Sequence, residues 1–177
     1  MYKLFKLKNR KNKVAMELYS ILVIQARRPH FYKYWGIPDT PDGRYDMIML
    51  HAFLVLHRLK YDHHNTKNIS QALFDLMFED MDKNLREMGA GDVGIGHRIK
   101  DMAKAFYGRI AAYELGLNQT GDLLEDAIKR NVYRNSLATD EQIARLCHYI
   151  RFEVDSLASQ PTKSFLDGKL TFRNPSH

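Results

Sequence analysis

The sequence contains no proline between Pro41 and Pro161. Proline removes a backbone donor and clashes with the preceding helical turn, so its absence over such a length favours long helices joined by glycine-containing loops. Apolar residues in this stretch recur every three or four positions, which is the spacing of one helix face. The sequence therefore predicts an all-α fold with a single domain of about six helices, near residues 14–28, 44–61, 69–88, 96–116, 120–134 and 139–159.

Two of these helices carry signals beyond periodicity. Thr139 and Gln142 have the spacing of a capping box, in which each side chain satisfies a free amide at the helix start. The segment Met47–Leu56 is apolar on every side apart from His51, and such a helix is usually surrounded by others. We therefore expect the helix at 44–61 to lie at the centre of the fold.

The histidines do not predict a metal site. His63 and His64 are expected in a polar turn, and no cysteine or glutamate stands at the ligand spacing of a zinc or di-iron centre. His51 is expected to be a hydrogen-bonded residue close to the core. Neither a metal nor a cofactor is predicted.

Glycines mark two positions. Gly89, Gly91 and Gly94 match the spacing of a dinucleotide-binding loop, but that loop follows a β-strand and here a helix precedes it. Gly89 is instead expected to end the helix at 69–88 in a left-handed conformation. Gly108 lies in the middle of the helix at 96–116, and we expect another helix to approach closely there.

The positive charge is confined to the N-terminus. The formal net charge is +6, and residues 14–177 hold 21 of the 27 basic residues together with all 21 acidic ones. The other six, interleaved with apolar residues, form a basic arm over residues 1–13: Lys3, Lys6, Lys8, Arg10, Lys11 and Lys13. Such a segment is attracted to anionic lipid or to ribosomal RNA, and a frayed, solvated terminus is an equally good interpretation.

The remaining segments are assigned as a helical domain over 14–160 and a non-helical C-terminal strap over 161–177. No apolar stretch reaches the roughly 20 residues that span a bilayer, so we expect peripheral membrane contact and no transmembrane segment. The single cysteine, Cys147, excludes an internal disulfide and fits a reducing compartment. Cys147 and the adjacent His148 face different ways on a helix, so we expect no nucleophile–base pair and no enzyme.

The helix at 69–88 is the richest segment for binding. Its acidic side chains at Asp75, Glu79 and Asp82 share one face, which could be ordinary solvated surface with Glu79–Lys83 and Asp82–Arg86 pairs. Six of the eight methionines lie between Met47 and Met102. Methionine fills cores and also suits surfaces that adapt to varied apolar partners.

Several segments together resemble the ubiquinol–cytochrome c chaperone family, strongly over residues 29–115 and weakly elsewhere. They are Phe31-Tyr32-x-x-Trp35-Gly36-Ile37-Pro38-Asp39-Thr40, Gly43-Arg44-Tyr45-Asp46 followed by His51, Gln71-Ala72-Leu73-Phe74-Asp75-x-Met77-Phe78-x-Asp80-Met81-Asp82, Leu85-Arg86-Glu87-Met88-Gly89-x-Gly91-Asp92 and Ala105-Phe106-Tyr107-Gly108-Arg109.

The resemblance implies a non-enzymatic assembly factor of the cytochrome bc1 complex that binds newly made cytochrome b. The mitochondrial member works with a small partner protein near the ribosomal exit tunnel, and this chain looks like a bacterial, alphaproteobacterial relative. We expect a cytoplasmic protein, peripheral at the inner membrane. Candidate contact residues for client or partner are Tyr32, Trp35, Asp39, Arg44, Asp46, Asp75, Phe78, Glu79 and Asp82. The alternative is a ribosome- or RNA-associated binding module that uses the basic arm.

Overall fold

The computed structural model describes residues 2–89 and 92–175, and the side chains of residues 11–89 and 94–175. The described residues contain helices and no β-strand, which confirms the all-α prediction. The elements are α1 (Tyr2–Ala26), α2 (Pro29–Lys33), α3 (Pro41–Lys60), α4 (His63–Glu87), α5 (Asp92–Asn118), α6 (Leu123–Ile128), the π-helical turn η1 (Lys129–Tyr133), α7 (Asp140–Ser159) and α8 (Thr162–Leu166).

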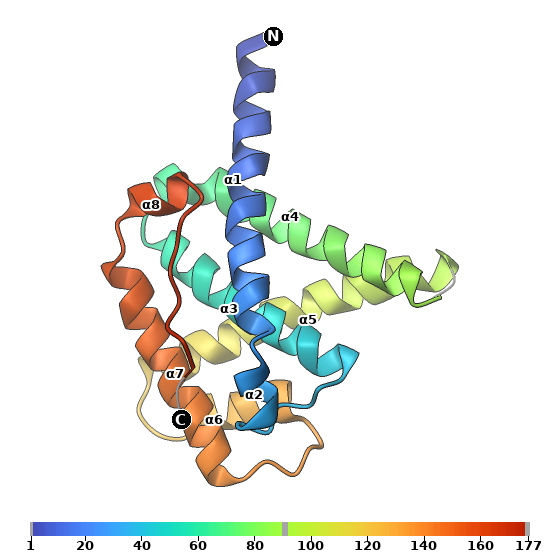
Figure 1. The fold of residues 1–177 in the computed structure, drawn as a ribbon, viewed down its shortest axis with the longest axis vertical. Coiled ribbons are helices and arrows are strands. Elements are labelled where there is room, and N and C mark those ends of the chain that lie inside the picture. The colour runs from blue at the N-terminus through green and yellow to red at the C-terminus, as the bar shows by residue number, and fades with distance from the viewer. Residues whose placement is uncertain (1, 90–91, 176–177) are drawn as a thin grey trace.

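Helix α3 lies at the centre of the fold, as its apolar sequence predicted. It packs against α1, α4 and α7, and the run from Asp46 to Val55 is buried throughout. Helices α4 and α5 form a hairpin that extends to one side of the body (Figure 1). Helix α7 and the turn η1 pack against α3, and α6 packs against α7. The buried apolar side chains form a single cluster to which α1, α3, α4 and α7 all contribute.

Two helices begin at least six residues before their predicted starts, α1 by twelve residues and α4 by six. The backbone of α1 is helical from Tyr2, so the basic arm continues directly into a core helix and projects beyond the body (Figure 1). Helix α4 begins at His63 rather than at residue 69, so the prediction of a polar turn at the two histidines is wrong. The reason is local bonding: the Thr66 hydroxyl donates to the Leu59 carbonyl at 2.6 Å and the Asn65 amide donates to Asp62 at 2.9 Å.

The C-terminal segment differs from a wholly non-helical strap, because it opens with the short helix α8. Phe165 is fully buried, and the guanidinium of Arg58 lies 5.0 Å from the centre of its ring. Arg58 also donates to the carbonyls of Leu157 and Gln160, which ties α8 to the end of α7. After a turn at residues 167–168 the chain has no regular secondary structure and runs between α1 and α7 (Figure 1), and we call residues 167–175 the strap.

Three local predictions are confirmed. The capping box is complete, since Thr139 accepts from the Gln142 amide and the Gln142 side chain accepts from the Thr139 amide. Gly89 follows α4 with a φ of 84°. The segment predicted at 120–134 is helical as α6 and η1, and it ends in a π-helical turn that places the Tyr133 hydroxyl 2.9 Å from the Trp35 carbonyl oxygen, to which it donates.

The predicted close helix crossing at Gly108 is wrong. A Cβ atom at this position would meet nothing within 4 Å, because this side of α5 faces open space. The close approach occurs two turns later at Gly116, where a Cβ atom would lie 2.6 Å from the backbone of Leu124 in α6. Gly116, and not Gly108, is therefore the glycine that allows two helices to pack.

We expect these two glycines of α5 to respond in opposite directions to alanine. Gly108→Ala should raise the free energy of unfolding by up to about 1 kcal/mol, because alanine is the better helix former and has room. Gly116→Ala should lower it by roughly 1–3 kcal/mol, because the new methyl group overlaps backbone. Urea denaturation followed by circular dichroism measures both, and equal shifts in the two variants would contradict the packing described for Gly116.

Candidate functional site

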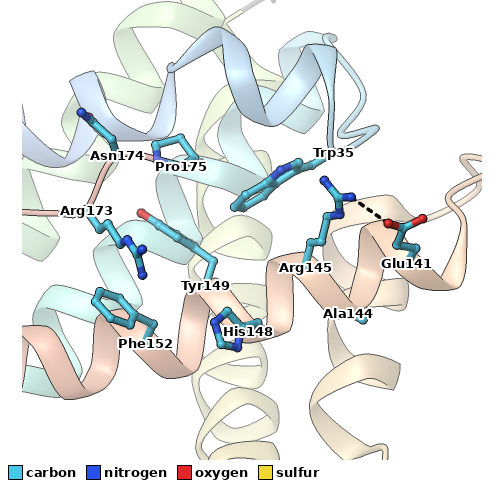
Figure 2. A pocket seen from close by; sticks show the side chains of 10 residues that line it. All are labelled: Trp35, Glu141, Ala144, Arg145, His148, Tyr149, Phe152, Arg173, Asn174 and Pro175. Carbon is cyan, nitrogen blue, oxygen red and sulfur yellow. Dashed lines mark hydrogen bonds and ion pairs between the residues drawn. The ribbon is translucent and has the colours of Figure 1, made fainter. Parts of the chain in front are cut away.

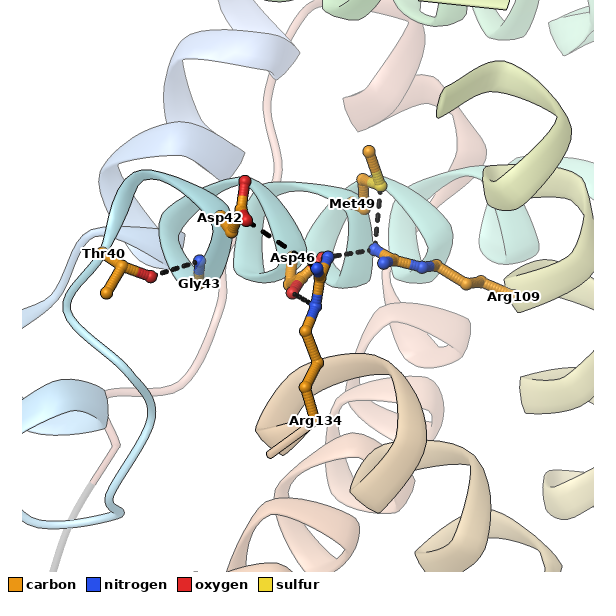
Figure 3. Close-up of polar contacts among 7 residues, drawn as sticks. All are labelled: Thr40, Asp42, Gly43, Asp46, Met49, Arg109 and Arg134. Carbon is orange, nitrogen blue, oxygen red and sulfur yellow. Dashed lines mark hydrogen bonds and ion pairs between the residues drawn. The ribbon is translucent and has the colours of Figure 1, made fainter. Parts of the chain in front are cut away.

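The loop before α3 and the first turns of this helix, residues 38–46, form one structural unit that we call the corner. Thr40 caps the helix by accepting a hydrogen bond from the Gly43 amide at 3.1 Å (Figure 3). Pro41 occupies the first helical turn, where its missing N–H costs nothing. A Cβ atom at Gly43 would collide with the carbonyl of Pro38, so the loop can press directly onto the helix. Asp39 and Arg44 are thereby held on either side of the cap.

A buried carboxylate anchors this corner to two other elements (Figure 3). Asp46 is 1% exposed at its side chain and receives Arg109 of α5 at 2.6 Å. Arg134, directly after η1, approaches the same carboxylate through two nitrogens at 2.7 and 2.8 Å. The pKa of Asp46 is raised above its ordinary value, because burial outweighs the opposing influence of the two guanidinium groups. With three short charge-assisted contacts, the carboxylate is ionised at neutral pH.

Arg134 is held in a sparsely populated backbone conformation, with φ 51° and ψ −114°. Such a residue costs of order 1–3 kcal/mol and persists only where its surroundings fix it. Here the bidentate contact with Asp46 and the π-helical turn before it supply that constraint. The corner is therefore built from three distant segments that hold one another in place.

An aromatic cluster lies behind the corner. Phe31 of α2 has ring contacts with Trp35, His51 and Tyr149, at centroid distances of 5.2, 5.5 and 5.2 Å. The Nδ1 atom of His51 lies 2.8 Å from the Met47 carbonyl, which can only accept, so Nδ1 carries the proton and Nε2 accepts from the Tyr149 hydroxyl at 3.0 Å. Burial lowers the pKa of His51 to about 4, so the ring is neutral. The prediction of a hydrogen-bonded core histidine is confirmed.

Three predicted site residues meet on the outer side of the corner. Tyr32, Asp39 and Arg44 line a hollow of about 460 Å³. Arg44 donates to Asp39 at 2.7 Å, and both side chains are more than half exposed. The Tyr32 hydroxyl donates to the Ala26 carbonyl at 2.7 Å, and burial raises its pKa to about 12. The hollow therefore combines an exposed ion pair with a tyrosine whose hydroxyl is hydrogen-bonded to the backbone.

A second hollow of about 460 Å³ lies between the start of α3 and the α4–α5 hairpin. Tyr45, Leu85, Met88 and Met102 supply its apolar lining, and Met88 is 55% exposed. The lining also contains Thr40, Pro41, Asp42, Gly89 and Arg98. Flexible, polarizable methionine side chains suit a surface that accepts different apolar shapes.

Three acidic residues of α4 share one face of the α4–α5 hairpin. Asp75 and Glu79 are exposed, and Asp82 is half-buried. Arg86 donates to Asp82 at 2.6 Å, as the spacing predicted, whereas Lys83 lies 3.9 Å from Glu87 instead of pairing with Glu79. The carboxylate of Asp75 accepts from Gln71 at 2.7 Å.

The other predicted contact residues lie inside the protein. Trp35 is 4% exposed, Asp46 is 1% exposed, and Phe78 is 8% exposed against Phe74 and Phe106. These three side chains are therefore too buried to form much direct contact with a client, although they pack beneath the surface residues. Of the arm, Lys11 is half-buried and Lys13 is exposed, whereas the side chains of Lys3, Lys6, Lys8 and Arg10 lie outside the described residues.

Sequence reasoning missed several residues of the second hollow. Tyr45, Arg98 and Met102 come from α3 and α5, and only the fold brings them beside Met88. The available signal was the concentration of methionine between Met47 and Met102. That signal does not separate Met88, which is exposed, from Met77 and Met81, which are buried.

The described part of the chain offers little reactive chemistry. Cys147 is buried, and burial raises the pKa of its thiol to about 12, which keeps it protonated. No group of three or more metal-ligating side chains occurs among the described residues. Within the same residues, no helix is both long and apolar enough to cross a bilayer.

These features define a single-domain, all-α protein with fixed hollows on its surface, and the comparisons give its family. The model of the ubiquinol-cytochrome C chaperone family matches residues 33–172, so the chain belongs to this family. The crystal structure of the Cbp3 homolog from Brucella abortus superimposes with a TM-score of 0.86 at 32% identity, over 98% of this chain and 97% of that one.

Two relatives carry the name ubiquinol-cytochrome c reductase complex assembly factor 1. The Xenopus laevis protein is 25% identical over 143 residues, which are 81% of this chain and 72% of that protein. The human protein is 23% identical over 160 residues, which are 90% of this chain and 54% of that protein. The chain therefore spans about half the length of the human relative.

Proposed function

We propose that this chain is a non-enzymatic chaperone that supports assembly of the ubiquinol–cytochrome c reductase (bc1) complex by binding newly made cytochrome b. The observation that carries the proposal is the family match over residues 33–172, joined by relatives named as assembly factors of this complex. Nothing in the comparisons favours the alternative of an RNA-binding module.

The surface we propose for the client combines the methionine-lined hollow with its charged surroundings. A newly made membrane protein exposes apolar helices joined by polar loops, so its holder needs an adaptable apolar surface and a polar rim. Met88 and Tyr45 offer the first, and the Asp39–Arg44 and Asp82–Arg86 pairs offer the second. The exposed carboxylates of Asp75 and Glu79 extend the rim along α4.

Reversing the acidic face should impair client binding without unfolding the protein. The triple replacement of Asp75, Glu79 and Asp82 by lysine removes one surface ion pair, Asp82–Arg86, worth only about 0.2–1 kcal/mol, and the hydrogen bond from Gln71 to Asp75. A complementary client loop would then meet like charge, which costs several kcal/mol. We expect assembled bc1 complex, and cytochrome b recovered with the tagged protein, to fall strongly in a strain that carries only this variant.

The control variant reverses three exposed carboxylates on α7 and at the start of α6, namely Asp122, Asp126 and Asp155. It changes the net charge equally and should leave assembly unchanged. Circular dichroism verifies that both variants retain their helices. Wild-type assembly in the α4 variant would mean that the client binds elsewhere. The surface around Tyr32 and Arg44 would then be the next in which to reverse the charges.

We also propose that residues 1–13 hold the protein at an anionic membrane surface, such as the inner membrane. All of the excess positive charge lies in this segment, and residues 2–13 form the first half of α1. Each basic residue close to such a surface contributes about 1 kcal/mol, screened by salt. We expect vesicles containing phosphatidylglycerol to float the full chain at low salt, with neutral vesicles as the control. Equal flotation of a chain beginning at Val14 would refute this role.

A further inference from the structure

A long groove runs between α7 and the strap, on elements separate from the proposed client surface. Its two hollows, of about 580 and 540 Å³, share the side chains of Phe152 and Arg173. Figure 2 shows the first hollow, with Trp35 on one side and residues of α7, among them Tyr149 and Phe152, on the other. We call the two hollows together the α7–strap groove. A 20-residue helix is about 30 Å long, which gives room for a peptide segment.

The walls of this groove are already fixed. Thr171 of the strap exchanges two hydrogen bonds with the Gln160 side chain, at 3.0 and 2.8 Å. The Arg173 amide donates to Glu153 at 2.7 Å, and its carbonyl accepts from Gln25 at 2.6 Å. A ligand that enters a preformed groove loses less free energy to ordering than one that must organise its own site.

The apolar part of the groove has the composition of a protein interface. Trp35 and Tyr149 line the hollow although each is only 4% exposed, while Phe152 is 38% exposed. The guanidinium of Arg173 lies 4.5 Å from the centre of the Phe152 ring. Tryptophan, tyrosine and arginine are the residues most enriched where binding energy concentrates between proteins.

The charged part of the groove is unbalanced. Arg145, Lys169 and Arg173 are lining cations, and Glu141 is the only lining carboxylate among the described residues. Glu141 already binds Arg145 at 2.7 Å. In the described part of the chain, no carboxylate forms an ion pair with Arg173. The groove therefore complements a ligand that carries both apolar side chains and excess negative charge.

We propose that the α7–strap groove binds an acidic peptide segment of a partner protein. An aromatic or aliphatic side chain of the segment lies against Phe152 and Tyr149, and its carboxylates pair with Arg173 and Lys169. A single-stranded nucleic acid fits less well, because base stacking needs open ring faces and Trp35 and Tyr149 are each only 4% exposed. A flat lipid surface cannot follow a concave groove between a helix and a strap.

Trp35 makes the proposal directly testable, because it is the only tryptophan of the chain and lines the groove. The probe is a pool of short synthetic peptides with phenylalanine or leucine anchors and aspartate or glutamate at the other positions. A second pool carries lysine at those positions. We expect the acidic pool to change the emission of Trp35 saturably, with weaker binding at higher salt, and the lysine pool to leave it unchanged.

Variants then locate the binding. Arg173→Glu keeps the backbone hydrogen bonds of the strap. It should lower the affinity for the acidic peptides by roughly tenfold or more. Lys104→Glu makes the same change in charge at an exposed position of α5 and should have no effect. If Arg173→Glu disturbs the helical circular dichroism spectrum, Lys169→Glu replaces it as the test variant.

Other outcomes overturn the proposal. Equal binding of both pools, or unchanged affinity in the Arg173→Glu and Lys169→Glu variants, would show that the cations of the groove do not contribute to peptide binding. A response of Trp35 to anionic vesicles or to polyuridylate, but not to the acidic peptides, would assign the groove to lipid or to nucleic acid. No response to any probe would remove it as a binding site, while leaving the proposed client surface untouched.

Discussion

We expect Asp46→Ala to lower the free energy of unfolding by about 3–5 kcal/mol, the cost of removing one partner from a buried ion pair. The side chain of Arg109 is only 10% exposed, so without Asp46 its guanidinium remains buried beside Met49 with no carboxylate. Arg134 suffers less, because its side chain is 45% exposed and can be hydrated. Urea denaturation of the purified protein measures the loss.

Two variants test the cause of this loss. Asp42 lies 3.9 Å from Arg134 but is 66% exposed, so Asp42→Ala should cost no more than about 1 kcal/mol. Replacing both Asp46 and Arg109 by leucine should restore most of the stability, because well-packed apolar pairs substitute for buried charges. Two results would show that an unpaired buried charge does not cause the loss of stability. One is an Asp46→Ala protein with the wild-type free energy of unfolding, and the other is a double variant no more stable than Asp46→Ala.

The second large effect is a dependence on pH that comes from Glu153. This side chain is fully buried, one oxygen accepts from the Arg173 amide, and the other has no hydrogen-bond partner among the described residues. Burial raises its pKa from 4.5 to about 7, against the smaller opposing influence of Arg173. Between these values the unfolded chain has lost a proton that the folded protein still holds.

Stability should therefore fall as the pH rises through this interval, by about 1.4 kcal/mol per pH unit and about 3 kcal/mol in all. Glu153→Gln keeps the acceptor for Arg173 and removes the ionisation, so its stability should not show this fall. The difference between the two proteins should be largest above neutral pH. Parallel stability curves from denaturation at several pH values would mean that Glu153 titrates normally.

The sequence was most informative where a helix carried its own signals. Helix α7 has both a regular apolar stripe and the Thr139–Gln142 capping box, and its predicted and observed bounds nearly coincide. Helices α2 and α8 were missed because five residues are too few to show a helical period. They persist because Phe31 and Phe165 are buried by residues far away in the chain, which is a tertiary effect.

The candidate site was predictable in part. The family resemblance drew attention to Tyr32, Asp39 and Arg44, which the fold brings around one hollow. It could not show that Asp46 and Phe78 are interior, since a charged residue in a helix gives no sign of a partner such as Arg134, 88 residues later. Local spacing also cannot decide whether a helical glycine meets a neighbour, and that is why the close approach was expected at Gly108.

The π-helical turn η1 also bears on how homologous chains should be aligned. The Arg134 amide donates to the Lys129 carbonyl at 2.7 Å, five residues back, so this turn accommodates one residue more than an α-helical turn would. Deleting a single residue here would restore the α-helical period and rotate all that follows by about 100° relative to α6. A homologue with a one-residue gap in this segment should therefore lack the contact that Arg134 makes here, and its equivalent of Asp46 should rely on the equivalent of Arg109 alone.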